Sequence, residues 1–372
     1  MSFLTDIYVL DTNYNIVGIL DNYNSAIFTK RYWECGDFEL YIKANKKSLE
    51  LLKPNYFVKY ANDTYIYVIE SIQLSTNQED GDFLTIKGRS AESILDRRIL
   101  YNHRAVSDKI GGFMVTYPTG SLIWTVEDCI RNALEMTIAP INPIEQGYLY
   151  DWYGNFVLGK RQGFTEIMPQ TQLTGVNLYD FVTEQCKKNN YGMRVHLNDN
   201  KNFEFNLYRG RDCSYNQKDN PHLIFSTEFG NLLNTNYIFN NTNFKSHIIT
   251  AGEGDGDNRL WIERYRKDTS HFSHINRREV FLDNKSVSSD EVENYIGLLN
   301  DTAEMEIIKY NAVEELDGEV TSIKGMEYQL GDIVQITTEY GLSATAKILE
   351  IIECENETGY SIIPTFDTWE VS

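Results

Sequence analysis

The chain has 372 residues, of which 42% are hydrophobic, 24% charged and 13% aromatic. This is the composition of a globular protein of two or three domains, and it excludes an intrinsically disordered chain. The 34 basic and 54 acidic residues give a formal net charge of −20. That charge argues against a general nucleic-acid-binding protein, because such proteins need many cations to bind phosphates.

The first hundred residues predict a series of β-strands. Short runs rich in β-branched and aromatic residues alternate with turn residues, as in an antiparallel sheet. The run from 65 to 74 has the pattern of a strand that is buried on both faces. Ser90 is expected to cap a short helix over residues 91–100. The predicted strands are residues 7–10, 15–20, 25–30, 38–42, 56–60, 65–74 and 83–87.

Residues 101–234 predict a mixture of helices and strands. Thr125 and Asp128 have the spacing of a helix capping box, and apolar residues follow them at helical spacing. A second helix is predicted to begin at Asn177 and to end before Gly192. The block is completed by two predicted strands, at residues 193–197 and 203–208.

The last third of the chain predicts β structure around one long helix. Ser288 and Glu291 form another capping-box pattern, and the apolar stripe behind them predicts the longest helix, ending near Leu316. The predicted strands are residues 237–239, 247–250, 260–265, 333–337, 344–353 and 360–364.

Two segments resemble each other in the order of their strand patterns. Gly36–Ile42 is similar to Gly256–Ile262, and each is followed by three further apolar patterns in the same order. Coincidence is the alternative, because short strand patterns recur by chance. The repeat favours an α+β, mainly β fold with two related β-barrel (tube) domains. The predicted domains are residues 1–100 (first barrel), 101–234 (α/β insert) and 235–372 (second barrel, with a long helix inserted at about 288–318).

Two similar barrels in one chain have a consequence for symmetry. Three such chains around a threefold axis would present six barrels in a quasi-sixfold ring. A ring of that kind can join a hexameric assembly to a threefold one. The repeat therefore predicts a symmetry adaptor.

Four stretches, in one order along nearly the whole chain, carry a resemblance to a known family. They are Trp33–Leu40, Gly88–Ile99, Ile249–Gly254, and Leu330–Val334 together with Gly359–Phe366. With them the chain resembles the gp27-like baseplate hub proteins of tailed bacteriophages. Within these it is similar to the siphophage tail-tip group called ReqiPepy6 Gp37-like, the short tail-associated (Tal) hubs without a lytic domain.

The resemblance implies a homotrimeric structural hub at the tail tip or baseplate of a virion. Such a trimer would link the hexameric tail end, made by the distal tail protein, to the threefold tip, and would form or close the channel for DNA ejection. Its implied partners are receptor-binding or other baseplate proteins, with the tape measure protein and phage DNA passing through without sequence recognition. An acidic channel lining would limit adhesion of DNA. The chain ends just after its last predicted strand, so no C-terminal lytic domain and no enzymatic activity are expected.

The sequence predicts neither secretion nor a membrane span. The N-terminus has no basic segment or cleavage site, and no stretch approaches the ~20 apolar residues of a spanning helix. No cysteine lies in a C-x-x-C pair, which predicts reduced thiols rather than a disulfide scaffold or a zinc site. The cysteines are Cys35, Cys129, Cys186, Cys213 and Cys354. We expect synthesis in the host bacterial cytoplasm, without stable membrane insertion, followed by incorporation into the virion.

No catalytic, cofactor-binding or metal-binding residue is predicted. The loop from Gly252 to Asn258 has glycines but no Walker lysine, and its acids lack the EF-hand spacing. An acidic turn is therefore favoured, and Ca²⁺ at subunit contacts stays an open alternative. His271 and His274 are three residues apart without an evident third ligand, which favours surface histidines.

Two serines match nucleophile motifs only in part. Ser343 follows Gly341 but lacks the second glycine of a nucleophile elbow, and it lies in a predicted hairpin. Ser90 fails in the same way. Glu314–Glu315 is an acid pair that could serve acid–base chemistry, but a solvated surface is the better interpretation in a chain with so many acids.

Two further clusters leave alternatives open. The arginine pairs Arg97–Arg98 and Arg277–Arg278 are either exposed cations or partners of acids across subunits. An aromatic cluster in the insert could stack on a sugar ring, form the core of a hairpin or contact another subunit. Its members are Tyr148, Tyr150, Trp152 and Tyr153.

Two other classes of function stay as alternatives to a structural hub. One is a tail-associated cell-wall hydrolase or peptidase, for which activity in a cell-wall zymogram would be the sign. The other is a carbohydrate-binding receptor-attachment module, for which glycan binding by residues 101–234 would be the sign.

Overall fold

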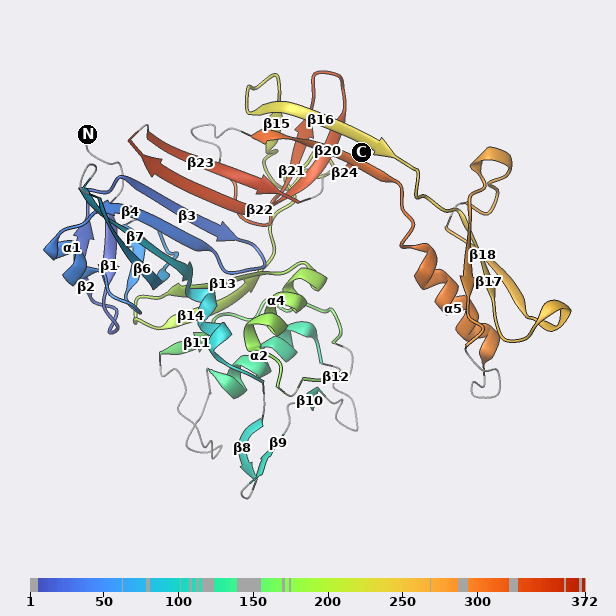
Figure 1. The fold of residues 1–372 in the computed structure, drawn as a ribbon, viewed down its shortest axis with the longest axis horizontal. Coiled ribbons are helices and arrows are strands. Elements are labelled where there is room, and N and C mark those ends of the chain that lie inside the picture. The colour runs from blue at the N-terminus through green and yellow to red at the C-terminus, as the bar shows by residue number, and fades with distance from the viewer. Residues whose placement is uncertain are drawn as a thin grey trace. The chain divides into compact units, whose positions relative to one another are not determined.

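The chain forms two compact units that are mainly β in content (Figure 1). Unit 1 comprises residues 1–234 and 318–370, and unit 2 comprises residues 235–317. The computed structural model describes residues 6–61, 63–77, 81–100, 102–106, 109–111, 114–115, 124–138, 155–168, 171–173, 175–267, 269–286, 294–320, 327–357, 359–367 and 370–371.

Unit 1 is built on a twelve-stranded sheet that joins both ends of the chain. The strand order is β15-β21-β22-β3-β4-β7-β6-β5-β1-β2, and β23 and β24 also pair with β22. Figure 1 shows the blue N-terminal strands beside the red strands from the end of the chain. The bounds are Ile7–Leu10 (β1), Ile16–Leu20 (β2), Ser25–Arg31 (β3), Asp37–Lys43 (β4), Phe57–Tyr60 (β5), Tyr67–Asn77 (β6), Gly81–Ser90 (β7), Ile224–Ser226 (β15), Ile333–Thr337 (β21), Ser343–Asn356 (β22), Gly359–Phe366 (β23) and Glu370–Val371 (β24).

Strand β22 connects two parts of this sheet. Its first half pairs antiparallel with β21 and its second half pairs antiparallel with β3. At the second junction Arg31 Nε donates a 2.7 Å hydrogen bond to Glu350, and Lys30 forms an ion pair with Glu353. The sequence predicts β3 and β22 in different domains and does not predict that they pair. Pairing between strands far apart in the chain leaves no local sequence pattern. Two separate barrels stay a prediction.

The repeat seen in the sequence does not correspond to one contiguous second module. Gly36–Ile42 runs into β4, inside the large sheet. Gly256–Ile262 instead covers a short 3-10 helix, η2 (Gly256–Asn258), and the start of β18 (Trp261–Tyr265) in unit 2. The patterns that follow it, from Ile333 onward, lie in unit 1. Alternating apolar residues show that a strand has one buried face, but they do not show which sheet it joins.

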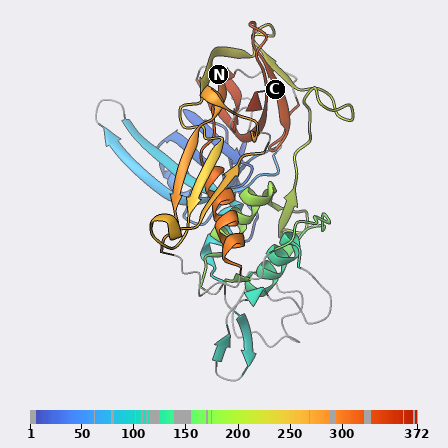
Figure 2. The same cartoon turned by 90° about the vertical axis from the view of Figure 1, so that its right-hand side faces the viewer.

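The middle of unit 1 packs two helices against a sheet of order β11-β14-β13. The helices α2 and α4 lie side by side (Figures 1 and 2). Both begin at the predicted N-caps: the Thr125 side chain accepts from the backbone N–H of Asp128, and the Asn177 side chain accepts from that of Asp180. The bounds are Val126–Thr137 (α2), Leu178–Asn189 (α4), Phe156–Leu158 (β11), Gly192–Leu197 (β13) and Phe203–Tyr208 (β14). Two small ribbons pair Asn102–Val106 (β8) with Lys109–Gly111 (β9) and Met114–Val115 (β10) with Thr171–Gln172 (β12).

The helix predicted after Ser90 is a 3-10 helix, η1 (Ala91–Arg97). The Ser90 side chain makes no capping hydrogen bond. Its hydroxyl accepts a 2.7 Å hydrogen bond from the backbone N–H of Gly36 and donates to the carboxylate of Glu92. Ser90 is therefore the N-cap residue, as predicted, but its hydroxyl accepts from the N–H of Gly36 rather than from an N–H of η1.

Two other details of the first hundred residues differ from the prediction. Strand β6 is buried on both faces only at its start, since Tyr67 is 1% exposed while Leu74 is 49% exposed. The short helix α1 (Lys46–Leu51), with Asn45 as its N-cap, is not predicted. Six residues are too few to show a helical period.

Unit 2 packs one helix against a three-stranded sheet of order β18-β17-β19. Ile248 of the central strand, Ala303 and Ile307 of the helix α5 form the small core. The central strand pairs antiparallel with β18 and parallel with β19. The bounds are His247–Ala251 (β17), Glu279–Asp283 (β19), His274–Asn276 (the 3-10 helix η3) and Tyr295–Ile307 (α5).

The long helix predicted over about 288–318 is shorter in the structure. Helix α5 ends at Ile307, and Val313–Val320 forms strand β20 instead. This strand pairs with β16 (Leu232–Asn240). The helical prediction beyond Ile307 is wrong because strand pairing overrides the local preference of these residues. The predicted capping box of Ser288 and Glu291 lies outside the described residues.

All five cysteines are free thiols, and burial raises the pKa of the deeply buried Cys129 and Cys186. Within the part of the chain that the structure describes, no helix combines the length and the apolar character that crossing a membrane requires.

Candidate functional site

The acidic loop Gly252–Asn258 is a turn between β17 and β18, as the sequence predicts. The exposed Asp255 pairs with Lys285 at 2.5 Å, and the backbone N–H of Glu253 donates to the Tyr295 hydroxyl. Over the described ranges, no three His, Cys, Asp or Glu side chains gather as they would around a metal ion. Ca²⁺ at subunit contacts stays a prediction.

The histidine and serine motifs lie in turns and strand ends. His271 packs edge-on against Phe272, with ring centroids 5.0 Å apart, and His274 begins η3. Ser343 opens β22 after the hairpin turn, as predicted, and its hydroxyl accepts a 2.6 Å hydrogen bond from the Gln335 amide. Neither arrangement brings a nucleophile next to a histidine base.

Arg277 finds its acidic partners within its own chain. It bonds to Glu263 of β18 at 2.5 Å and to Glu279 of β19 at 2.6 Å, the two strands on either side of β17. Arg278 donates to the carbonyl oxygen of Asn241, and Arg98 donates to that of Arg97. Pairing of these arginines across subunits stays a prediction. The aromatic cluster of Tyr148, Tyr150, Trp152 and Tyr153 lies outside the described residues, as do the side chains of Glu314 and Glu315.

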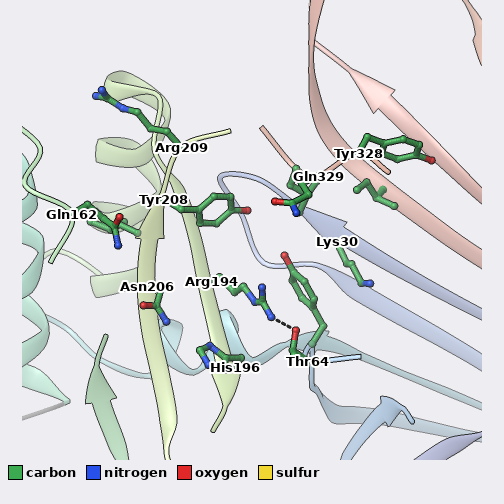
Figure 3. A pocket seen from close by; sticks show the side chains of 14 residues that line it. Lys30, Thr64, Gln162, Arg194, His196, Asn206, Tyr208, Arg209, Tyr328 and Gln329 are labelled. Atoms are coloured by element: carbon green, nitrogen blue, oxygen red, sulfur yellow. Dashed lines mark hydrogen bonds between the residues drawn. The ribbon is translucent and has the colours of Figure 1, made fainter. Parts of the chain in front are cut away.

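A pocket of about 660 Å³ lies in unit 1 where β3, β13 and β14 approach one another (Figure 3). Strand β3 contributes Lys30, and β13 contributes Arg194 and His196. The pocket also includes Tyr208 of β14 and Tyr328, which precedes β21. Polar and aromatic side chains thus converge on one cavity from segments that are far apart in the chain.

Two of the cations in this pocket already have carboxylate partners. Lys30 lies 2.5 Å from Asp63 and also pairs with Glu353. Arg209 hydrogen-bonds to Glu166. Hydrogen bonds from Tyr191 and Arg209 lower the pKa of Glu166 to about 2, so this carboxylate stays ionised at neutral pH.

Arg194 differs from these two cations. Its guanidinium donates to the Thr64 hydroxyl (Figure 3). It also lies 4.8 Å from the ring centroid of Tyr65. No carboxylate of a described residue comes within ion-pair distance of it, and its Nε is buried without a hydrogen-bond partner. The pocket therefore contains one positive charge that makes no salt bridge with a described residue, although it interacts electrostatically with the buried Glu92.

Two more buried polar atoms of the pocket lack hydrogen-bond partners among the described residues. They are Nδ1 of His196 and the hydroxyl of Tyr328. Burial and the neighbouring Arg194 lower the pKa of His196, so its imidazole is neutral near pH 7. Burial raises the pKa of Tyr328 to about 12, so its hydroxyl keeps its proton.

The sequence does not single out this pocket. The residues that line it are spread along the chain between Lys30 and Ile351. Only one feature of the local sequence pattern points to it. Arg194 and His196 are two residues apart in a predicted strand, which places both side chains on one face. A cation and an imidazole on the same face of a strand could have marked part of the site.

The face of the unit 2 sheet opposite α5 carries exposed aromatic side chains. Trp261 and Phe281 are 54% and 51% exposed, and their ring centroids are 5.7 Å apart. Tyr265 is also 54% exposed. Arg259 lies 5.5 Å from the Trp261 ring, which it partly covers. We call the surface formed by Trp261, Tyr265 and Phe281 the aromatic face.

Strand β2 presents a second apolar surface, on unit 1. It lies at one end of the strand order of the large sheet. Ile16, Val17 and Ile19 are 57%, 45% and 48% exposed. Apolar side chains on an end strand are typical of a place where another chain is added to a sheet.

The chain has relatives among tail proteins. A family model described as Siphovirus ReqiPepy6 Gp37-like protein matches residues 6–366. The fold is similar to that of the tail protein from Neisseria meningitidis MC58, with a TM-score of 0.54, 12% identity and coverage of 98% of this chain and 96% of that chain. It is also similar to the prophage tail protein gp18 from Listeria monocytogenes EGD-e, with a TM-score of 0.52, 13% identity and coverage of 97% of this chain and 94% of that chain. A third similar structure is the 43 kDa tail protein of prophage MuSo2 from Shewanella oneidensis, with a TM-score of 0.51, 13% identity and coverage of 98% of each chain. At these identities the likeness shows a shared fold alone. No curated protein matches the sequence.

Proposed function

Because the chain belongs to the Siphovirus ReqiPepy6 Gp37-like protein family, a family of bacteriophage tail proteins, we propose that it is the structural hub of a tail tip or baseplate. Three copies form a homotrimer that links the hexameric tail end, built by the distal tail protein, to the threefold tip. The trimer forms or closes the channel through which the tape measure protein and DNA leave. Its role is mechanical and involves no turnover of a substrate.

The observation that carries the proposal is the apolar surface that the single chain leaves uncovered. The aromatic face and the exposed side chains of β2 belong to different units, and each presents apolar side chains that another protein could cover. Soluble monomers seldom expose contiguous apolar patches of this kind without using them in binding. Contacts between subunits and with neighbouring tail proteins would cover them.

The large sheet supports the proposed match between threefold and sixfold symmetry. Strand β22 pairs with β21 through its first half and with β3 through its second half, and we propose that the parts on its two sides act as two connected β modules. Three chains would place six modules around an axis. The net charge of −20 supports passage of DNA through the ring, because phosphates and an acidic surface repel each other.

Light scattering on the purified full chain tests the proposal. The expected mass is three times that of one chain, and class averages from electron microscopy should show a ring with a central opening. A mass of one chain at micromolar concentration, with no larger species when the distal tail protein is added, would contradict the hub.

A further inference from the structure

We propose that the pocket around Arg194 binds a small polyhydroxylated ligand that carries an oxyanion, such as an acidic sugar or a sugar phosphate. Arg194 holds the oxyanion, and the surrounding tyrosine and amide side chains hold the hydroxyl-bearing body (Figure 3). The site is distinct from the aromatic face and from β2, so it is a function additional to assembly.

The charge distribution selects an anion. Lys30 and Arg209 already bond to carboxylates of the chain, whereas Arg194 has only the neutral Thr64 hydroxyl as a hydrogen-bond partner among the described residues. The chain carries 54 acidic residues, yet none of the described ones forms an ion pair with this guanidinium. A planar guanidinium with free donors is the group that best matches the two oxygens of a carboxylate or a phosphate.

The unpaired polar atoms indicate that the site is built for a ligand. Buried polar atoms in proteins almost always have hydrogen-bond partners, so unpaired ones call for an explanation. Here three of them, Arg194 Nε, His196 Nδ1 and the Tyr328 hydroxyl, belong to residues that line the same pocket. Two can donate and the imidazole nitrogen can accept or donate according to its tautomer. All three atoms are buried, so a ligand with anionic oxygens and hydroxyl groups would give them partners when these pocket-lining side chains turn toward it.

The size and lining of the pocket identify the body of the ligand. A volume of about 660 Å³ lies in the range of ~300–1,000 Å³ that holds small organic molecules, and it exceeds what a lone inorganic ion needs. Three amide side chains can each donate and accept hydrogen bonds, and three tyrosines add aromatic rings, of which that of Tyr65 already lies against Lys30 and Arg194. The amides are Gln162, Asn206 and Gln329, and the tyrosines are Tyr65, Tyr208 and Tyr328.

Calorimetric titration of the full chain tests this site with defined probes. Glucuronate supplies a carboxylate on a sugar, glucose 6-phosphate supplies a phosphate on the same sugar, and glucose supplies neither. We expect binding of at least one of the two anionic sugars and none of glucose. Whichever of the two binds more tightly identifies the source of the oxyanion.

Two variants connect the binding to the pocket. Arg194→Gln should weaken binding about tenfold or more, the loss expected for a charge-assisted hydrogen bond. The matched control is Arg161→Gln, because Arg161 is exposed, pairs with Asp128 and does not line the pocket. Tyr328→Phe removes a hydroxyl that has no partner in the described chain, so it should weaken binding without lowering the melting temperature. This second variant keeps the test decisive if Arg194→Gln folds poorly.

Several results would overturn the proposal. These are failure of both anionic sugars to bind at millimolar concentration, equal binding of glucose, and unchanged binding in both pocket variants. Binding of inorganic phosphate or of an acidic peptide, with no binding of the anionic sugars, would also reject a sugar site. The light-scattering mass is independent of all these results, so the hub and the pocket succeed or fail separately.

Discussion

The carboxylate of Glu92 accepts a 2.7 Å hydrogen bond from the backbone N–H of Val195, 103 residues further along the chain. Its other oxygen accepts from the Ser90 hydroxyl, which in turn accepts from the backbone N–H of Gly36. Glu92 is only 2% exposed. One buried side chain therefore ties η1 to β13 and to the turn before β4.

Replacing Glu92 should destabilise unit 1. Glu92→Ala leaves the Val195 N–H without an acceptor, and we expect the free energy of unfolding to fall by about 3 kcal/mol. Glu92→Gln keeps one acceptor oxygen and should cost about 1 kcal/mol. Urea denaturation followed by circular dichroism measures both values. Equal losses for the two variants would show that packing, not the hydrogen bond, sets the cost.

Glu92 should also give stability a defined pH dependence. Burial raises its pKa above the ordinary 4.5, although the hydrogen bonds from Ser90 and Val195 act in the opposite direction. For a carboxyl with a raised pKa, the stabilising contribution is complete below the unfolded value and is lost as the pH rises through the folded value. The melting temperature of the wild type, relative to that of Glu92→Gln, should therefore rise as the pH falls from 7 toward 4.5. Parallel curves would contradict this assignment.

Glu166 should act with the opposite sign. Hydrogen bonds from Tyr191 and Arg209 lower its pKa to about 2, so its contribution is present above 4.5 and is lost as the pH falls toward 2. The side chain is 35% exposed, so we expect no more than about 1 kcal/mol. Glu166→Gln should remove this acid sensitivity from the melting temperature. Glu184→Gln, an exposed change on α4, is the control and should leave it intact.

The pair of Arg211 and Asp332 should be the most costly to break. Asp332 is fully buried and accepts hydrogen bonds from the backbone N–H of Arg211 at 2.8 Å, from its guanidinium at 2.6 Å, and from the backbone N–H of Gln329 at 3.0 Å. Asp332→Ala should lower the free energy of unfolding by about 3 kcal/mol or more, because two part-buried N–H groups and the guanidinium lose their acceptor. Glu39→Ala breaks an exposed pair with Lys87 and should cost less than about 1 kcal/mol. Similar losses for the two variants in urea denaturation would refute the difference.

Assembly should depend on the aromatic face. The double variant Trp261→Ser with Phe281→Ser removes exposed rings, so it should leave the circular dichroism spectrum unchanged while reducing the light-scattering mass toward that of one chain. Tyr340→Ser is the matched control, since Tyr340 is 81% exposed and lies in the turn between β21 and β22. An unchanged mass for the double variant would show that this face is not a subunit contact.

Local patterns predict much of the secondary structure. The strands of the first hundred residues and the caps at Thr125 and Asn177 agree with the sequence, because alternation and capping depend on neighbours within a few residues. The structure also shows why residue 36 is a glycine, which the sequence pattern does not reveal. A Cβ at this position would lie 1.9 Å from the carbonyl oxygen of Thr29, so no larger residue fits between these strands.

The remaining features depend on contacts between distant residues. The end of α5 at Ile307 is set by the pairing of β20 with β16, which no local pattern reports. The pocket is likewise absent from the sequence pattern, because Thr64, Arg194 and Tyr328 come together only when the whole of unit 1 is folded. A cation without a salt bridge is recognised only once all its neighbours are known.

The shared strand β22 has a consequence for how the protein is made. Lys30 in β3 and its partner Glu353 in β22 are separated by 323 residues, so β3 leaves the ribosome long before the strand that completes it. Until then the nascent chain exposes an open edge of the sheet, and open edges invite pairing with other chains. A ribosome that stops short of β22 would release a polypeptide prone to aggregate. Synthesis of β22, near the end of the chain, thus covers the sheet edge left open by β3, near its beginning.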